Sequence, residues 1–370
     1  MDRRAAMLVD RLGGDARQVR LVRAPGRVNL IGDHTDYNDG FCLPIAIDRD
    51  CIVAARPGPP GRVHAESLDT GSRVDIPAAG STPPPGPGWG RFVAAATQVA
   101  SQRSGVIAGT SLVVSSTVPI GSGLSSSAAL CVALISALGD PPTSERERRE
   151  LARAARQAEL LATEVPIGPM DQLASVFGHP NAALFLDCRT LEIIPVPLPT
   201  TAAVAVVHSG LPRSLEGSAY AERRAACVAA AHRVGVAALR DATPAQVADD
   251  PIARHVVSEN ARVVDAVAAL RRGDLVRLGA LMAASHASLR DDFRVSTPEL
   301  DTLVEALLES GAIGARLTGA GFGGCVVAVT APEQRDAILA AATDRYRSRT
   351  GLDPQAFPVR AVGGAGRIEP

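Results

Sequence analysis

Six polar side chains crowd into eleven positions near the start of the chain, directly after an apolar stretch. They are Arg27, Asn29, Asp33, His34, Asp36 and Tyr37. In a folding core each of these groups would need a buried partner or water. Carboxylates accept hydrogen bonds from hydroxyls, and an imidazole can donate or accept, so the cluster suits a polyhydroxylated small molecule. The alternative is a solvated turn that pivots at Gly32 after a strand.

A second group able to do chemistry is the glycine- and serine-rich segment 119–129, between a predicted strand and a predicted helix. Two glycines would let the backbone come close to a ligand, and three serines offer hydroxyls. They are Gly121, Gly123, Ser125, Ser126 and Ser127. The N-terminus of the following helix supplies free N–H groups and a positive dipole end. This pattern favours phosphate binding over a serine-capped helix after a glycine turn.

Segment 317–324 matches the G-x-G-x-x-G pattern of dinucleotide-binding proteins through Gly319, Gly321 and Gly324. That fingerprint must open a helix, whereas residues 325–330 are predicted to form a strand. Nicotinamide or flavin binding, and with it a dehydrogenase, is therefore disfavoured. A loop that packs against another backbone segment or a bound phosphate remains.

One further carboxylate, Asp171, lies within segment 165–172, at the start of a short predicted helix at 171–177. Aspartate is a preferred residue at helix N-termini, so a capping role is the simplest interpretation of the local sequence. A role in binding or catalysis stays open.

The composition excludes several classes of protein. All 38 basic residues are arginine, so the Walker-A lysine, the protein-kinase strand lysine and a Schiff-base lysine are absent. A net charge of −1 gives no case for nucleic acid or an anionic membrane. Six scattered cysteines without a C-x-x-C pair argue against zinc or disulfides and fit a reducing cytosol. Without a signal peptide or a long apolar run, we expect a cytoplasmic protein.

The elements that must position these groups are strands followed by helix-rich stretches, which predicts an α+β chain of two lobes with a boundary near 195–200. A helix should begin at Ser144, where Ser-Glu-Arg-Glu forms a capping box. The expected strands are 20–31, 41–47, 51–55, 111–118, 203–207 and 325–330, and the remaining helices are 124–138, 219–235, 251–271, 274–288, 297–310 and 333–346.

Taken together, these segments resemble the galactokinase branch of the GHMP small-molecule kinases. Residues 26–38 resemble its sugar signature, 119–129 its ATP loop and 317–324 its third motif. Further matches at 168–172, 217–224 and 289–293 follow in family order across most of the chain. The resemblance implies a ribosomal S5 domain 2-like N-terminal lobe (1–198) and a ferredoxin-like C-terminal lobe (199–370). The last strand, near 356–366, would return to the first lobe.

The resemblance also implies the activity and its residues. ATP would phosphorylate the anomeric C1 hydroxyl of galactose, which admits galactose to the Leloir pathway. Asp171 would be the catalytic carboxylate, with Arg27 beside it to orient the group and stabilise charge; whether Asp171 removes the proton or mainly positions the hydroxyl stays open. The implied sugar contacts are Asp33, His34, Asp36, Gly168 and Tyr220.

The implied nucleotide site uses the glycines and serines of segment 119–129, with Mg²⁺ held by Ser127 and Glu159 and adenine near Trp89. Glu159 could instead be a solvated helix charge, and Trp89 could be simply packed. The implied partners are ATP, Mg²⁺ and a small-molecule sugar, with no nucleic acid and no membrane, and we expect a monomer.

One position departs from the family, which usually has glutamate where this chain has Asp33. The carboxylate loses one methylene, about 1.5 Å of reach, at the position implied to bind the C6 hydroxyl. Galactose remains the first candidate. The alternatives are a kinase for a related substrate (a C6- or C2-modified galactose, arabinose, an amino alcohol or mevalonate) and a non-catalytic galactose and ATP sensor. The intact serines at 125–127 argue against the sensor.

Overall fold

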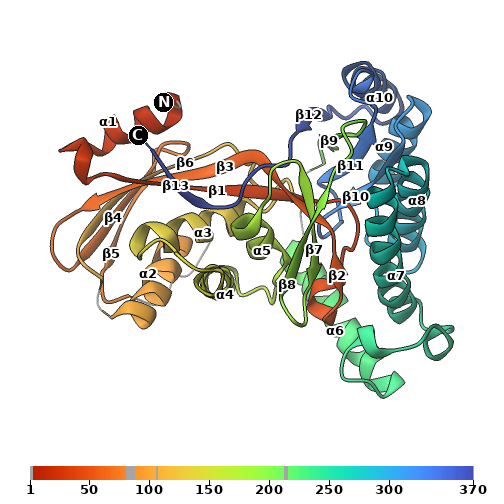
Figure 1. The fold of residues 1–370 in the computed structure, drawn as a ribbon, viewed down its shortest axis with the longest axis horizontal. Coiled ribbons are helices and arrows are strands. Elements are labelled where there is room, and N and C mark those ends of the chain that lie inside the picture. Colours follow the sequence, from red (N-terminus) through yellow and green to blue (C-terminus); the bar gives the residue numbers. More distant parts are fainter. Residues whose placement is uncertain (1–2, 81–87, 106, 212–215, 370) are drawn as a thin grey trace.

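The fold is seen in a computed structural model that describes residues 3–80, 88–105, 107–211 and 216–369. The proline-rich loop expected at 83–88 lies, except for Gly88, outside the described residues. Two lobes lie along the long axis of the molecule, and a small sheet stands between them (Figure 1).

The first lobe is built on a six-stranded mixed sheet in the order β13-β1-β3-β6-β4-β5. Only the β4–β6 pair is parallel. The strands are β1 (Arg20–Asn29), β3 (Pro44–Pro57), β4 (Arg62–Ser67), β5 (Arg73–Pro77), β6 (Thr110–Ser116) and β13 (Gly366–Ile368). One face is covered by α2 (Gly90–Ser104), α3 (Ser126–Leu138), α4 (Glu145–Thr163) and α5 (Met170–Phe177), the other by α1 (Arg3–Leu12) (Figure 1).

Alternating side chains of the central strands enter two different cores. Leu21, Ile52 and Val113 pack beneath α1, whereas their neighbours Val22 and Val53 face the helices on the opposite side. This two-residue period is what a sheet covered on both faces requires.

The predicted division into strands at 41–47 and 51–55 is wrong. Residues 44–57 form the single strand β3, and only Phe41–Cys42 form a separate strand, β2. That prediction left residues 48–50 outside both strands. Asp50 instead stays in the strand because Arg4 and Arg23 both pair with its carboxylate.

The second lobe is built on an antiparallel sheet in the order β10-β11-β9-β12, which is the strand order of a ferredoxin-like lobe. Its strands are β9 (Ala203–His208), β10 (Gly314–Thr318), β11 (Cys325–Thr330) and β12 (Gln355–Val359). The helices of this half are α6 (Glu216–Val234), α7 (Pro251–Arg272), α8 (Leu275–Asp291), α9 (Pro298–Glu309) and α10 (Arg335–Thr350). The lobe has its own core, which contains Phe293, Leu317 and Tyr346.

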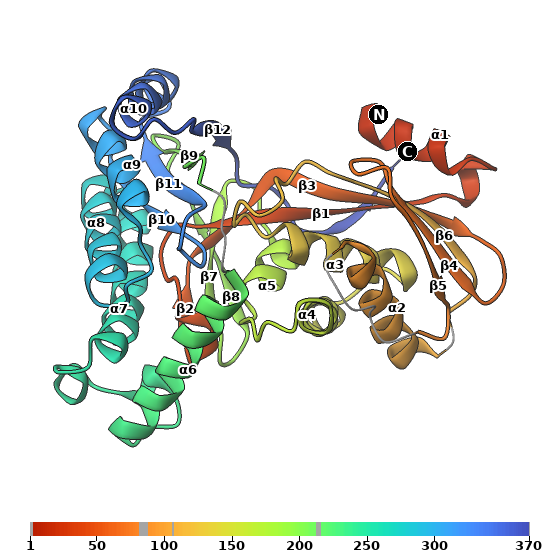
Figure 2. The same cartoon turned by 180° about the vertical axis from the view of Figure 1, so that it is seen from behind.

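The end of the chain joins the two lobes. The segment expected as one returning strand divides, since β12 belongs to the second sheet and β13 pairs with β1 in the first. Both termini therefore lie at the α1 end of the first lobe in the two views (Figures 1 and 2). Between the lobes, β2, β7 (Ala182–Asp187) and β8 (Glu192–Pro197) form a three-stranded sheet.

Helix ends follow the sequence signals. Ser144 caps α4 through the expected reciprocal bonds with Glu147. Asp250 caps α7, which ends at Gly273 in the left-handed conformation. Short 3-10 helices lie at Ala16–Gln18, Asp36–Asn38, Leu239–Asp241 and Pro244–Val247. Of the helices in the described part of the chain, none combines the length and apolar character of a membrane span.

Candidate active site

A bidentate ion pair lies at the centre of the candidate site. The Nε and Nη2 atoms of Arg27, at the end of β1, each donate to one carboxylate oxygen of Asp171 over 2.8 Å. The third guanidinium nitrogen, Nη1, donates to the carbonyl of Gly123 at 2.6 Å. Arg27 is buried, so its charge depends on this carboxylate for compensation.

Asp171 does not cap its helix. The N-cap of α5 is Pro169, and the Asp171 side chain turns toward Arg27 and Ser125 instead. The Ser125 hydroxyl donates to Asp171 Oδ2 at 2.6 Å. Ser125 itself has a left-handed φ of 62° and makes no side-chain cap bond to α3. The glycine-serine segment is thus joined directly to the candidate catalytic carboxylate.

Glu159 is buried on α4 and is not a solvated helix charge. Its two oxygens accept hydrogen bonds of 2.5 Å from the Ser127 hydroxyl and the Gln172 amide. Burial, and then the charge of Asp171, raises the pKa of Glu159 to about 7. The amide oxygen Oε1 of Gln172 is buried and has no hydrogen-bond partner among the described residues. A carboxylate, a hydroxyl and an unused amide oxygen are the oxygen ligands that a hard cation prefers.

The described residues contain no group of three or more His, Cys, Asp or Glu side chains that could hold a metal ion. This sparse set nevertheless fits Mg²⁺, which keeps several waters and is usually held by one or two protein ligands together with substrate phosphates. The N-terminus of α3 and the left-handed glycines Gly121 and Gly123 lie beside it. Both features suit phosphate oxygens.

His34 begins the other half of the site, in the loop after β1. Its Nε2 donates to the carbonyl of Ala320 at 3.2 Å, since a carbonyl can only accept, so Nδ1 accepts from the Tyr37 hydroxyl at 2.8 Å. Burial, followed by the charge of His255, lowers the pKa of His34 to about 3. His34 is therefore a neutral imidazole at physiological pH.

Asp36, Gly168 and Tyr220 meet beside this imidazole. Burial, and then the charge of Asp171, raises the pKa of Asp36 to about 6. An ideal Cβ on Gly168 would stand 1.9 Å from Asp36 Oδ2, so only glycine leaves room for that carboxylate. Tyr220, on α6, stacks its ring edge-on against Tyr37 at 5.4 Å. Burial raises the pKa of Tyr220 well above its usual range, so its hydroxyl remains a donor.

Asp33 differs from the other acids because the chain itself surrounds its carboxylate. Arg316 pairs with Oδ2, and the Asn29 amide and the Gly319 backbone N–H donate to Oδ1 at 3.1 and 3.3 Å. Only 2% of the Asp33 side chain is exposed.

Every residue to which the sequence assigned a catalytic, sugar, nucleotide or metal role lines one cavity of about 750 Å³ between the lobes, whereas Asn29 and Tyr37 of the polar cluster do not. The residues with an assigned role are Arg27, Asp33, His34, Asp36, Trp89, Gly121, Gly123, Ser125, Ser126, Ser127, Glu159, Gly168, Asp171 and Tyr220. One wall of the cavity, formed by the β4–β5 turn and by α2, was not predicted from the sequence. That wall contains Ser67, Asp69, Thr70, Ser72 and Phe92. The turn-forming residues Asp69-Thr70-Gly71 indicate a β-hairpin, and predicting that hairpin could have identified this wall.

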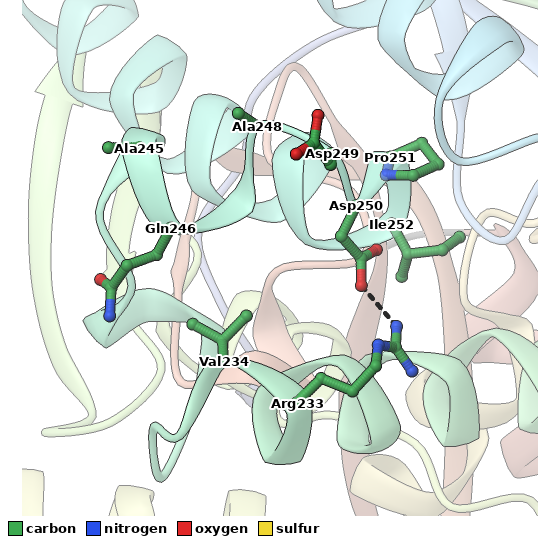
Figure 3. Close-up of a pocket in the computed structure, with 9 residues that line it drawn as sticks. All are labelled: Arg233, Val234, Ala245, Gln246, Ala248, Asp249, Asp250, Pro251 and Ile252. Atoms are coloured by element: carbon green, nitrogen blue, oxygen red, sulfur yellow. Dashed lines mark hydrogen bonds and ion pairs between the residues drawn. The ribbon is translucent and has the colours of Figure 1, made fainter.

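A second, more open hollow of about 550 Å³ lies between the end of α6 and the start of α7 (Figure 3). Arg233 and Asp250 form an ion pair within it. None of the expected site residues lines this hollow.

Comparison with known proteins gives three family-model matches. The galactokinase galactose-binding signature matches residues 10–57, the GHMP kinase N-terminal domain 91–179 and the GHMP kinase C-terminal domain 266–348. Galactokinase of Chloroflexus aurantiacus is 43% identical over 94% of this chain and 92% of its own length. Galactokinase of Pasteurella multocida is 41% identical over 93% of each.

Solved structures of GHMP kinases are also similar to this chain. The structure of Lactococcus lactis galactokinase complexed with galactose is 31% identical, has a TM-score of 0.87 and covers 98% of this chain and 99% of that one. Mevalonate kinase of Methanococcus jannaschii is 17% identical with a TM-score of 0.68, over 93% of this chain and 98% of that one, which shows a shared fold alone.

Proposed function

Because the chain belongs to the galactokinase family of the GHMP kinases, we propose that it transfers the terminal phosphoryl group of ATP to the C1 hydroxyl of galactose. The observation that carries this proposal is the junction of Arg27, Asp171 and Ser125. There, one carboxylate contacts both the arginine that precedes the sugar loop and the serine of the phosphate-binding segment. Such a junction would bring a phosphoryl acceptor and a phosphoryl donor together at one carboxylate.

Asp171 is the group that faces the acceptor hydroxyl. It orients the C1 hydroxyl and takes its proton as the oxygen attacks the γ-phosphorus, and ADP leaves with the electrons of the broken P–O bond. The proton then passes to solvent, and the products are galactose 1-phosphate and ADP. Arg27 holds Asp171 in place through two hydrogen bonds and keeps a positive charge beside the transferring group.

Both acidic and neutral side chains would contact the sugar. Asp36, beside Gly168, accepts hydrogen bonds from sugar hydroxyls, and Tyr220 donates one. His34 contributes a neutral ring whose orientation is fixed by Tyr37 and Ala320. An epimer that left Asp36 unpaired in this buried setting would bind poorly.

The ATP phosphates would lie over Gly121, Gly123 and the first turn of α3, where backbone N–H groups and the helix dipole favour negative charge. Ser127 and Glu159 would hold Mg²⁺, which neutralises charge that develops on the phosphate oxygens when it is bound. The raised pKa of Glu159 fits this role, because a cation beside it would favour the ionised carboxylate.

The adenine would lie at the far end of the cavity, where Trp89, Phe92, Val114 and Leu130 form an apolar wall. The indole Nε1–H of Trp89 is buried and has no hydrogen-bond partner among the described residues. We propose that the enzyme is a cytoplasmic monomer, as expected from the sequence; its six cysteines are all buried thiols, which fits a reducing cytosol.

A sugar panel tests the proposed function. The purified protein is assayed for ADP release with Mg-ATP and galactose, 2-deoxygalactose, galactosamine, arabinose or glucose. Turnover confined to galactose and its C2 variants is expected. Preference for another sugar would replace galactose as the substrate, and a folded protein without turnover would contradict the kinase assignment.

A further inference from the structure

The Asp33 carboxylate already accepts hydrogen bonds from other groups of the same chain. Its oxygens accept from Arg316, from the Asn29 amide and from the Gly319 backbone N–H. An ionised carboxylate offers about four acceptor positions, so three of them are used. Although Asp33 belongs to the cavity lining, only 2% of its side chain is exposed, and its ion-pair partner Arg316 lies on β10 of the second lobe.

Arg316, on β10, is the largest fully buried side chain in the described part of the protein. Its Nη2 pairs with Asp33, and its Nη1 donates to the carbonyl of Leu30 at 3.3 Å. One guanidinium therefore joins the first and last residues of the turn at 30–33. The turn passes through Gly32 at a φ of +98°, a conformation that only glycine adopts readily.

The opposite side of the same turn is fixed by α7. The Glu259 carboxylate accepts from the Gly32 backbone N–H at 2.9 Å, and His255 Nε2 donates to the carbonyl of Asp33 at 3.2 Å. The turn is thus held between β10 and α7, both from the second lobe. His34 and Asp36, which line the cavity, follow it directly in the chain.

We propose that Arg316 is a positioning residue for the sugar site and that Asp33 serves to hold it, not to bind the C6 hydroxyl of the sugar. This inference rests on the proposed galactose phosphorylation. If the carboxylate turned toward a C6 hydroxyl, the buried Arg316 charge would lose the one carboxylate that pairs with it in the described part of the chain. The family's glutamate is one methylene longer, whereas this chain has a side chain whose length matches the Arg316 pair.

The first test determines whether Asp33 binds the C6 hydroxyl of the sugar. We would measure kcat/KM for galactose and for 6-deoxygalactose with the wild type and with Asp33→Asn, which keeps the shape and removes the charge. The galactose to 6-deoxygalactose ratio should change by less than about threefold, because both substrates lose the same positioning. A larger fall in that ratio would mean that Asp33 binds the C6 hydroxyl and would overturn the inference.

The second test addresses Arg316. Arg316→Met should raise the galactose KM by about tenfold or more, with the ATP dissociation constant, read from Trp89 fluorescence, unchanged within about twofold. Arg316→Lys should recover part of the loss, and Asp33→Asn/Arg316→Met removes both buried charges so that a folded protein is retained. Arg23→Lys, in an ion pair outside the cavity, is the matched control.

An unchanged galactose KM in folded Arg316→Met, or an equal weakening of ATP binding, would contradict the positioning role. If the wild type forms no galactose 1-phosphate, the proposed function itself fails. If it does form that product and the two tests fail, only the inference about Arg316 and Asp33 is lost.

Discussion

Adding a single methyl group at Gly168 should disable sugar recognition without touching the catalytic carboxylate. The ideal Cβ would stand 1.9 Å from Oδ2 and 2.2 Å from Cγ of Asp36. Close carbon–oxygen contacts in proteins are about 3.3 Å, so the Asp36 carboxylate must retreat by more than about 1 Å. The φ of Gly168 lies outside the left-handed region, so alanine fits the backbone and the whole effect comes from this clash.

A retreat of this size would remove the hydrogen bonds that Asp36 is proposed to make to the sugar. Each hydrogen bond to a charged group contributes about 1.5–3 kcal/mol, so Gly168→Ala should lower kcat/KM for galactose by about 10- to 150-fold per bond lost. ATP binding should stay within about twofold of the wild type, because Trp89, at the N-cap of α2, and Asp36, in the loop after β1, belong to different elements of the cavity lining. The assay is ADP release over a range of galactose concentrations, with Trp89 fluorescence for ATP.

Gly363→Ala is the matched control, because an ideal Cβ at Gly363 would meet no atom within 4 Å. Its kinetics and melting temperature should match those of the wild type. If folded Gly168→Ala phosphorylates galactose as well as the wild type, Asp36 does not contact the sugar and the proposed recognition is wrong.

Three further predictions concern charge, nucleotide and metal. Burial raises the folded-state pKa of Asp36 to about 6, so its ionisation costs up to about 3 kcal/mol above pH 6, and this cost disappears as the pH falls from 6 to 4. Asp36→Asn should therefore raise the Tm at pH 8 and leave it unchanged near pH 4; a gain independent of pH would refute the shift. Trp89 is the single tryptophan of the chain, so ATP should change its fluorescence saturably, whereas a signal unaffected by ATP would remove adenine from that wall. Ser127→Ala should raise the Mg²⁺ concentration that gives half-maximal activity by about tenfold, with galactose binding, measured by calorimetry, unchanged; an unaltered Mg²⁺ requirement would argue against the metal assignment.

The site could be anticipated because its parts are local in sequence. The polar cluster at the end of β1 and just after it, the glycine-serine segment before α3 and Asp171 in the first turn of α5 each combine chemistry with a recognisable element boundary. Glu159 could be placed only through the resemblance, because its position at the edge of an apolar helix face fits a solvated charge equally well. Its burial depends on Ser127 and Gln172, which come from two other helices.

The role of Arg316 could not be anticipated, because its partner Asp33 is 283 positions away and no periodic pattern links them. The continuity of β3 was missed for a related reason, since the ion pairs of Asp50 come from α1 and β1. Among the α-helices and strands that the structure describes, seven were not foreseen: α1, α2, β4, β5, β7, β8 and β10. Several are short strands whose assignment depends on pairing with distant partners, which sequence periodicity does not reveal.

Identification of the reaction product tests the central claim most directly. The wild type and Asp171→Asn are each incubated with Mg-ATP and galactose, and the phosphorylated sugar is identified by ³¹P and ¹³C NMR. The account predicts galactose 1-phosphate in the wild-type reaction. With Asp171→Asn it predicts a rate lower by about 10²- to 10⁴-fold, with ATP binding retained. Phosphate on any other hydroxyl, or undiminished turnover by Asp171→Asn, would contradict it.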